Sequence, residues 1–236
     1  MKKSGVISLE LGIELPQGMW SFTPSLLCSE DELILVDTGV AGMVQEVEAK
    51  LKEAGYSLEQ LTGILLTHQD ADHIGNLTEI VESYPGIKVY AHAADRPYID
   101  GELPLLKQMP LTMQLNTAHF PLVSGTVVTD TIQDGDQLAF GGGVIVIDTP
   151  GHTPGHISLY HPASKTLIAG DAMLNRGGQL QGPNPMQTPD LEQAYHSLTR
   201  FAAYDIEKVL CYHGGWYEEG NVNERIAEIA AAGTQG

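Results

Sequence analysis

The chain has 236 residues, of which 42% are hydrophobic and 18% are charged, and this ordinary globular composition argues against a disordered protein. The 30 acidic residues outnumber the 12 basic ones, which gives a formal net charge of −18. Nucleic-acid binding depends on clusters of lysine and arginine that are missing here, so we expect no nucleic-acid partner. The length suits one large domain or two small ones.

Predicted strands and helices alternate along the first part of the chain. Apolar runs bounded by polar residues predict strands, and apolar residues at helical spacing predict helices. The expected strands are residues 6–13, 25–29, 33–36, 63–66 and 87–92. An amphipathic helix is expected over residues 44–54, and a second helix contains Ile74, Leu77, Ile80 and Val81.

Residues 93–125 interrupt this alternation. Prolines separate short apolar clusters here, at Pro97, Pro104, Pro110 and Pro121. Connections this long without clear regular structure are often lids or binding loops, so we expect a lid-like insertion. A helical hairpin on the surface is the alternative. Residues 19–22, Met-Trp-Ser-Phe, are a second candidate for the wall of a pocket.

A second group of strands follows this segment. It comprises residues 137–140, 144–148, 157–161, 166–169 and 208–212. Residues 175–189 are rich in Gly, Gln and Pro and are expected to form a loop. Helices are expected over residues 191–201 and 223–232, with His196 of the first helix turned to solvent.

Residues 67–75, with the sequence Thr-His-Gln-Asp-Ala-Asp-His-Ile-Gly, lie between an expected buried strand and an expected helix. This turn contains the imidazoles of His68 and His73 and the carboxylates of Asp70 and Asp72. Carboxylates packed together repel each other, and each costs free energy to desolvate unless a cation neutralises it. A polar surface loop is the alternative for such a motif taken alone, but its density of ligand side chains favours a divalent metal.

Three further potential ligands, His152, Asp171 and His213, each follow an apolar run in the second group of strands. Strand ends and the loops beyond them are where ligands gather in layered α/β folds. We therefore expect these three side chains to join the motif of residues 67–75 in one metal site.

These residues together resemble the metallo-β-lactamase superfamily, whose pattern is H-x-H-x-D-H followed by a His, an Asp and a final His. The resemblance runs from residue 37 to residue 215. It implies an α/β fold, a four-layer αβ/βα sandwich of two mixed β-sheets with helices outside, as a single domain over residues 1–236. It also implies two divalent metal ions per chain. One ion would be held by His68, Asp70 and His152, the other by Asp72, His73 and His213, with Asp171 as the bridge.

The sequence departs from the superfamily pattern at Asp70, where a second His is usual. A carboxylate at this position resembles the flavodiiron branch, which has Glu there. A hard anionic oxygen shifts metal preference away from zinc toward iron or manganese. Zinc also accepts oxygen ligands, so we expect zinc, with iron or manganese as alternatives.

A metal pair of this kind lowers the pKa of a bound water to roughly 7. The expected reaction is therefore attack by metal-bound hydroxide on the acyl bond of a small-molecule ester, lactone or thioester, with Asp72 also catalytic because it could orient the hydroxide or relay a proton. The alternatives are a flavodiiron-like di-iron redox domain, β-lactam hydrolysis, and a metal-binding regulator without catalysis. No Gly-x-Ser-x-Gly elbow occurs, so a serine nucleophile is unsupported.

Four other residues have smaller expected roles. Asp37 is either a turn residue or an acceptor that fixes a metal-binding His. His92 is expected to be structural or to line the pocket. Cys28 and Cys211 are expected to be small buried hydrophobic residues in a reducing compartment.

The N-terminal residues do not resemble a targeting segment. They begin basic but meet Glu10 before any apolar core of a signal peptide develops. No run approaches the ~20 apolar residues of a membrane span. We therefore expect a cytoplasmic protein with no membrane partner.

Overall fold

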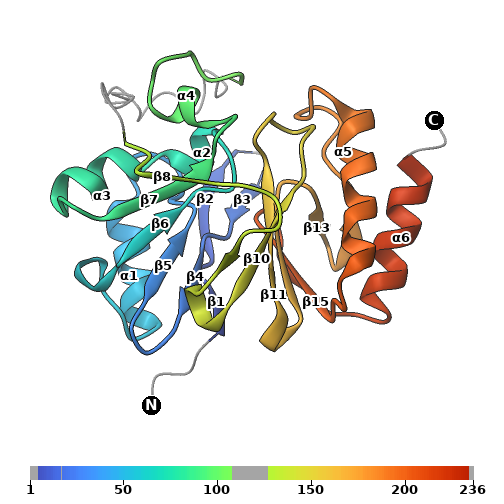
Figure 1. The fold of residues 1–236 in the computed structure, drawn as a ribbon, viewed down its shortest axis with the longest axis horizontal. Coiled ribbons are helices and arrows are strands. Elements are labelled where there is room, and N and C mark those ends of the chain that lie inside the picture. The colour runs from blue at the N-terminus through green and yellow to red at the C-terminus, as the bar shows by residue number, and fades with distance from the viewer. Residues whose placement is uncertain (1–4, 17, 108–126, 234–236) are drawn as a thin grey trace.

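The computed structural model describes residues 5–16, 18–107 and 127–233, which build two six-stranded sheets packed face to face (Figure 1). The first sheet has the order β1-β4-β5-β6-β7-β8 and the second the order β16-β15-β12-β11-β10-β9. The strands of the first sheet are β1 (Gly5–Ser8), β4 (Ser25–Cys28), β5 (Leu33–Val36), β6 (Gly63–Leu65), β7 (Lys88–His92) and β8 (Asp130–Ile132). Those of the second are β9 (Gln137–Leu138), β10 (Val144–Asp148), β11 (Ile157–His161), β12 (Thr166–Gly170), β15 (Lys208–Cys211) and β16 (Gly215–Tyr217).

Alternation of side chains along each strand explains the layers. In β5, Leu33 and Leu35 belong to the core under the helices of the first sheet, whereas Ile34 and Val36 belong to the core between the two sheets. In β12, Leu167 likewise lies in the core under the helices of the second sheet, while Ile168 lies in the core between the two sheets. Burying each large aliphatic side chain contributes about 1.5–3 kcal/mol, so strands that are apolar on both faces stabilise both contacts.

Helices cover the outer face of each sheet. Those of the first sheet are α1 (Val44–Glu53), α2 (Ala71–Ile74), α3 (Leu77–Ser83) and α4 (Arg96–Ile99), and those of the second are α5 (Leu191–Leu198) and α6 (Val222–Gly233). Figure 1 shows α1 and α3 on one flank and α5 and α6 on the opposite one. This arrangement confirms the expected αβ/βα sandwich. Within the described ranges, no helix combines the length and hydropathy needed to cross a bilayer.

Both sheets are mixed. In the first, β5 to β8 run parallel and β1, β4 and β5 pair antiparallel. In the second, β12 and β15 are the parallel pair. The carboxyl ends of these parallel strands lead directly to residues 37, 67 and 68 in one sheet, and to residues 171 and 213 in the other. Loops from both sheets therefore start at strand ends, where ligands of α/β folds collect.

Three sequence-based expectations were wrong in detail. Residues 6–13 form two strands, because β2 (Leu11–Leu15) leaves the sheet of β1 and pairs with β3 (Gly18–Phe22) as a separate hairpin. The strand expected at 137–140 is only β9, because a 3-10 turn with left-handed Gly141 (φ 62°) begins at Phe140.

The loop expected at residues 175–189 contains a hairpin of β13 (Leu174–Arg176) and β14 (Gln179–Gln181). Its two connecting residues, Gly177 and Gly178, have φ of 60° and 80°, as a type I′ turn requires. The expected insertion at residues 93–125 begins with α4, and its part from residue 108 onward lies outside the described residues.

Candidate metal centre

The side chains expected to bind metal converge at the strand ends where the two sheets meet. Two groups form, each with donor atoms within 4.8 Å of one another: His68, His152 and Asp171, and Asp72, His73 and His213. The carboxylate of Asp70 lies against the first group, with Oδ2 3.3 Å from His68 Nε2 and 3.0 Å from His152 Nε2. All seven residues are therefore together, although they come from four separate segments of the chain.

Asp171 touches both groups. Its Oδ2 lies 3.4 Å from His152 Nε2 and 3.5 Å from His213 Nε2, and its Oδ1 lies 3.3 Å from His73 Nε2. Asp72 completes the second group, with Oδ2 3.3 Å from His213 Nε2. One carboxylate in contact with the imidazoles of both groups is the geometry that a bridging ligand requires.

The imidazoles present Nε2 to the centre because their Nδ1 atoms are engaged elsewhere. His73 Nδ1 donates to Asp37 Oδ2 at 2.9 Å, and His213 Nδ1 donates to the carbonyl of Ser21 at 3.2 Å. His68 Nδ1 lies 3.0 Å from the hydroxyl of Thr67, which itself donates to Asp37. Acceptors behind a histidine fix its tautomer and leave the lone pair of Nε2 available to a metal.

Several buried nitrogen and oxygen atoms of this centre, all potential metal ligands, make no hydrogen bond within the described part of the chain. They are Nε2 of His68 and His73 and Oδ1 of Asp70 and Asp171. Leaving a buried polar atom unsatisfied costs about 1–3 kcal/mol. The set of nitrogen and oxygen donors matches the preferences of zinc, iron and manganese, so the residues present fit divalent ions.

The charges of the centre point the same way. Burial alone would lower the pKa of His73, but the carboxylates of Asp37, Asp171 and Asp72 raise it to about 10. Burial likewise opposes the shift at His213, whose pKa is raised well above its ordinary value by Asp171 and Asp72. Carboxylates this close together stabilise whatever positive charge lies among them, whether protons on the imidazoles or metal ions.

A cavity of about 380 Å³ opens onto these groups. Its lining includes Asp70, Asp72, His152, Asp171 and His213. Its walls include Met19, Trp20 and Ser21 of β3, so the expectation that residues 19–22 line a pocket holds for those three. The cavity has the size of a small-molecule site.

Comparison with known proteins identifies the family. The family model of the Metallo-beta-lactamase superfamily matches residues 23–213. The chain belongs to this superfamily. It is 29% identical over 214 residues to the probable metallo-hydrolase YflN of Bacillus subtilis (strain 168), covering 84% of this chain and 81% of that protein.

A further sequence relative and a solved structure extend the comparison. The hydroxyacylglutathione hydrolase of Idiomarina loihiensis (strain ATCC BAA-735 / DSM 15497 / L2-TR) is 32% identical over 197 residues, which cover 82% of this chain and 60% of that enzyme. The crystal structure of the metallo-beta-lactamase family protein TTHA1429 from Thermus thermophilus superposes with a TM-score of 0.73. That match has 23% identity and covers 97% of this chain and 79% of the other, so it shows a shared fold.

His156 supports the candidate metal centre from behind, a role that the sequence did not reveal. Its Nε2 accepts the backbone N–H of Asp171 at 3.0 Å, so its Nδ1 carries a hydrogen and donates to Thr149 Oγ1 at 2.8 Å. Burial holds the pKa of His156 well below its ordinary value, which keeps the ring neutral. The repeat of Thr-Pro-Gly-His at residues 149–152 and 153–156 was the available signal.

Asp95 is a second supporting residue that the sequence did not reveal. Its fully buried carboxylate accepts hydrogen bonds from the backbone and side chain of Gln69, from Thr153 Oγ1 at 2.7 Å and from Gly155 N at 2.8 Å. Gln69 in turn accepts from the backbone of Leu106 at 3.0 Å. Asp95 therefore ties the loop of His68 to the loop of His152, and no local pattern around Asp95 predicts this.

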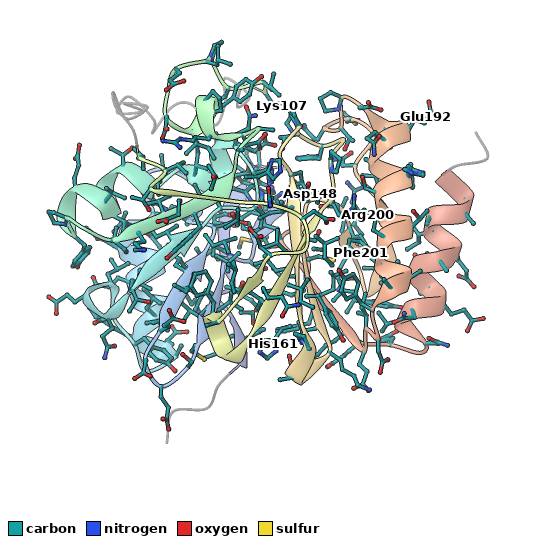
Figure 2. All side chains as sticks on the ribbon, viewed as in Figure 1. Lys107, Asp148, His161, Glu192, Arg200 and Phe201 are labelled. Carbon is teal, nitrogen blue, oxygen red and sulfur yellow. The ribbon has the colours of Figure 1, made fainter. Side chains whose placement is uncertain are left out.

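The remaining candidates lie outside the two groups of donor atoms. His92 Nε2 is 3.5 Å from Asp148 Oδ2, and His92 belongs to neither group and does not line the cavity. Cys28 and Cys211 are buried in the cores beneath the helices. His196 is exposed, as expected. Another histidine, His161, lies far from the centre, at the end of the molecule opposite Lys107 in Figure 2.

Proposed function

We propose that this protein is a metal-dependent hydrolase that uses two divalent ions to cleave the acyl bond of a small-molecule substrate. One observation carries the proposal: buried imidazole and carboxylate atoms without hydrogen-bond partners in the described part of the chain lie together beside a cavity that Asp70 and Asp171 line. Such atoms lower the stability of the fold unless a cation satisfies them. A purely structural polar cluster would have been completed by partners of its own.

The donor set divides between two ions. His68, Asp70 and His152 would hold one and Asp72, His73 and His213 the other, with Asp171 in contact with both groups. Bound there, the ions would polarise a carbonyl as Lewis acids and lower the pKa of a water to roughly 7.

The protein's own residues would then orient the reactants. Burial raises the pKa of Asp72, but His73 and His213 outweigh this effect and leave it below the ordinary value, so Asp72 is ionised at neutral pH. Asp72 lines the cavity, and its main-chain carbonyl accepts a hydrogen bond from the hydroxyl of Tyr212. Asp72 is thereby held where it would accept a proton from the attacking water and pass it to the leaving group.

The substrate class is an acyl compound, with thioesters as the first choice. Its support is similarity to hydroxyacylglutathione hydrolases, of which this chain spans little more than half the length. Trp20, Met19 and Leu174 give the cavity an apolar wall for the acyl part. Esters and lactones share the same carbonyl chemistry and belong to the proposal.

A second candidate function, a redox reaction at a di-iron site, is supported by the carboxylate of Asp70. An oxygen ligand at this position favours iron or manganese more than a histidine would. Elemental analysis of protein purified without chelator or nickel would identify the metals and their stoichiometry. Oxygen consumption with an added reductant would favour the redox role.

The decisive test is a panel of thioesters, esters, lactones and phosphodiesters assayed at equal metal loading. We expect turnover of at least one acyl class and loss of that activity after chelation. Turnover of phosphodiesters alone, or full activity after complete removal of metal, would refute the proposal. The exposed His196→Ala variant serves as a control for handling and loading.

A further inference from the structure

Lys107 is a basic side chain that reaches two of the atoms assigned to one metal ion. Its Nζ lies 2.6 Å from Asp70 Oδ2 and 2.7 Å from His152 Nε2. It also donates to the main-chain carbonyls of His152 at 3.2 Å and Gln187 at 3.0 Å. The side chain is only 17% exposed and lies at the upper end of the molecule in Figure 2, the end at which α4 lies in Figure 1.

A buried link holds the segment of Lys107 against the ligand motif of residues 67–75. The backbone N–H of Leu106 donates to Gln69 Oε1 at 3.0 Å, and Gln69 Nε2 donates to Asp95 Oδ1 at 3.2 Å. Gln69 and Asp95 are both fully buried. The chain therefore presents Lys107 to the metal ligands through the same network that joins their loops.

An ammonium group and a metal ion compete for these atoms. A neutral imidazole nitrogen has one lone pair, so His152 Nε2 either accepts a proton of Lys107 or binds an ion. The tautomer is the same in both cases, with the hydrogen on Nδ1 facing Thr188 Oγ1 at 3.3 Å. Two positive charges at such short distances also repel, and both draw on the carboxylate of Asp70.

The departure from the superfamily pattern at Asp70 supplies the partner of this lysine. The histidine that is usual there would offer an ammonium group no negative charge. Charge-assisted hydrogen bonds to a carboxylate are stronger than those to neutral acceptors, so the aspartate strengthens the hold on Lys107.

We propose that Lys107 is an internal competitor for the metal ion of the first group, the ion held by His68, Asp70 and His152. Binding of this ion releases Lys107 from the two ligands, and the carbonyls of His152 and Gln187 remain as its neighbours. Within the described ranges, Lys107 forms no hydrogen bond or ion pair with the second group, so it lowers the affinity of the first group alone. This inference rests on the metal sites of the proposed function and not on hydrolysis.

The test measures metal affinity rather than activity. Competition with a chromophoric chelator gives a dissociation constant for each Zn²⁺ ion. In Lys107→Met, which keeps a long side chain without its charge, one constant should fall by about tenfold or more, because the ion no longer displaces charge-assisted hydrogen bonds. The other constant should stay within about twofold. Lys50→Met removes the same charge from an ion pair with Glu53 in α1 and should leave both constants unchanged.

Thermal unfolding distinguishes competition from a purely structural contact. Lys107→Met should lower the melting temperature of the metal-free protein, because Asp70 loses its cation. It should not lower the melting temperature of protein saturated with Zn²⁺, because the gain in metal affinity offsets the loss. A structural contact would lower both.

Labelling of lysine amines with a succinimidyl ester, followed by peptide mass spectrometry, shows whether Lys107 moves. Its labelling should increase as the ion of the first group binds, with Lys50 as the internal reference. Two unchanged dissociation constants in Lys107→Met, a melting temperature lowered equally with and without Zn²⁺, or labelling of Lys107 that Zn²⁺ does not change would overturn the inference. None of these measurements involves turnover, so a lack of hydrolysis would refute the proposed function alone.

Discussion

Asp37→Asn tests whether the metal centre depends on the carboxylate behind its histidines. Asp37 has φ of 60°, a left-handed conformation that asparagine adopts readily, so the substitution leaves the backbone unstrained. The carboxylate accepts three hydrogen bonds, from Thr67 N at 2.8 Å, Thr67 Oγ1 at 2.8 Å and His73 Nδ1 at 2.9 Å.

The amide retains only part of this arrangement. Its oxygen can still accept from Thr67 N, and its NH₂ group can donate to Thr67 Oγ1. The same NH₂ group, however, faces the Nδ1–H of His73, and two donors repel. The neutral ring of His73, which is the form that binds a metal, avoids this contact by carrying its hydrogen on Nε2, and this tautomer lacks the lone pair that a metal needs. One charge-assisted hydrogen bond is lost, about 1.5–3 kcal/mol, which corresponds to a metal affinity lower by about 10- to 100-fold.

Competition with a chromophoric chelator would measure the affinity of each ion, and thermal unfolding of the metal-free protein would measure stability. Asp100→Asn is the control, because Asp100 is also buried and accepts from Val127 N and Val128 N at 2.8 Å but belongs to neither group of metal-binding side chains. It should lower stability and leave metal affinity intact. Metal affinity of Asp37→Asn within about twofold of the wild type, or equal losses in both variants, would refute the role of Asp37.

Asp171→Ala should lose both ions together, whereas His73→Ala should chiefly empty one position, as elemental analysis after dialysis would show; two ions retained in the Asp171 variant would exclude a bridge. Because the pKa of His73 is raised to about 10 and that of His213 is also raised, both imidazoles carry protons at pH 7 that ligation must displace. Metal affinity should therefore rise with pH toward 10, with roughly two protons released per chain at pH 7, measured by calorimetry in buffers of different ionisation enthalpy; no proton release would contradict the assignment. Gly75→Ala should destabilise the protein by about 3 kcal/mol, the upper end of overpacking costs, because its Cβ would lie 2.2 Å from the backbone N of Ala41. Urea unfolding would measure this, and an unchanged midpoint would count against the close packing.

Local patterns in the sequence predicted most of the strands and helices that form the layers. They did not predict strand pairing between residues that are distant along the chain. Residues 33–36 and 166–169 are apolar on both faces and could only be buried between two layers. Residues 6–13 show the limit. Their composition suits a strand throughout, but only pairing partners decide that β1 joins β4 while β2 turns back onto β3.

The sequence by itself determined which side chains have the chemistry for metal, because imidazoles and carboxylates at strand ends are visible without coordinates. It also determined that His68 and His73 lie near each other, because they are close along the chain. Only the tertiary structure decided that Lys107 contacts Asp70 and that Asp95 holds two ligand loops together. The contacts of Asp95 join residues 26 to 60 positions apart, and the packing of the two sheets selects which of these residues become neighbours. Local propensity carries no information about such distances, so the links between the ligand loops were set by the fold.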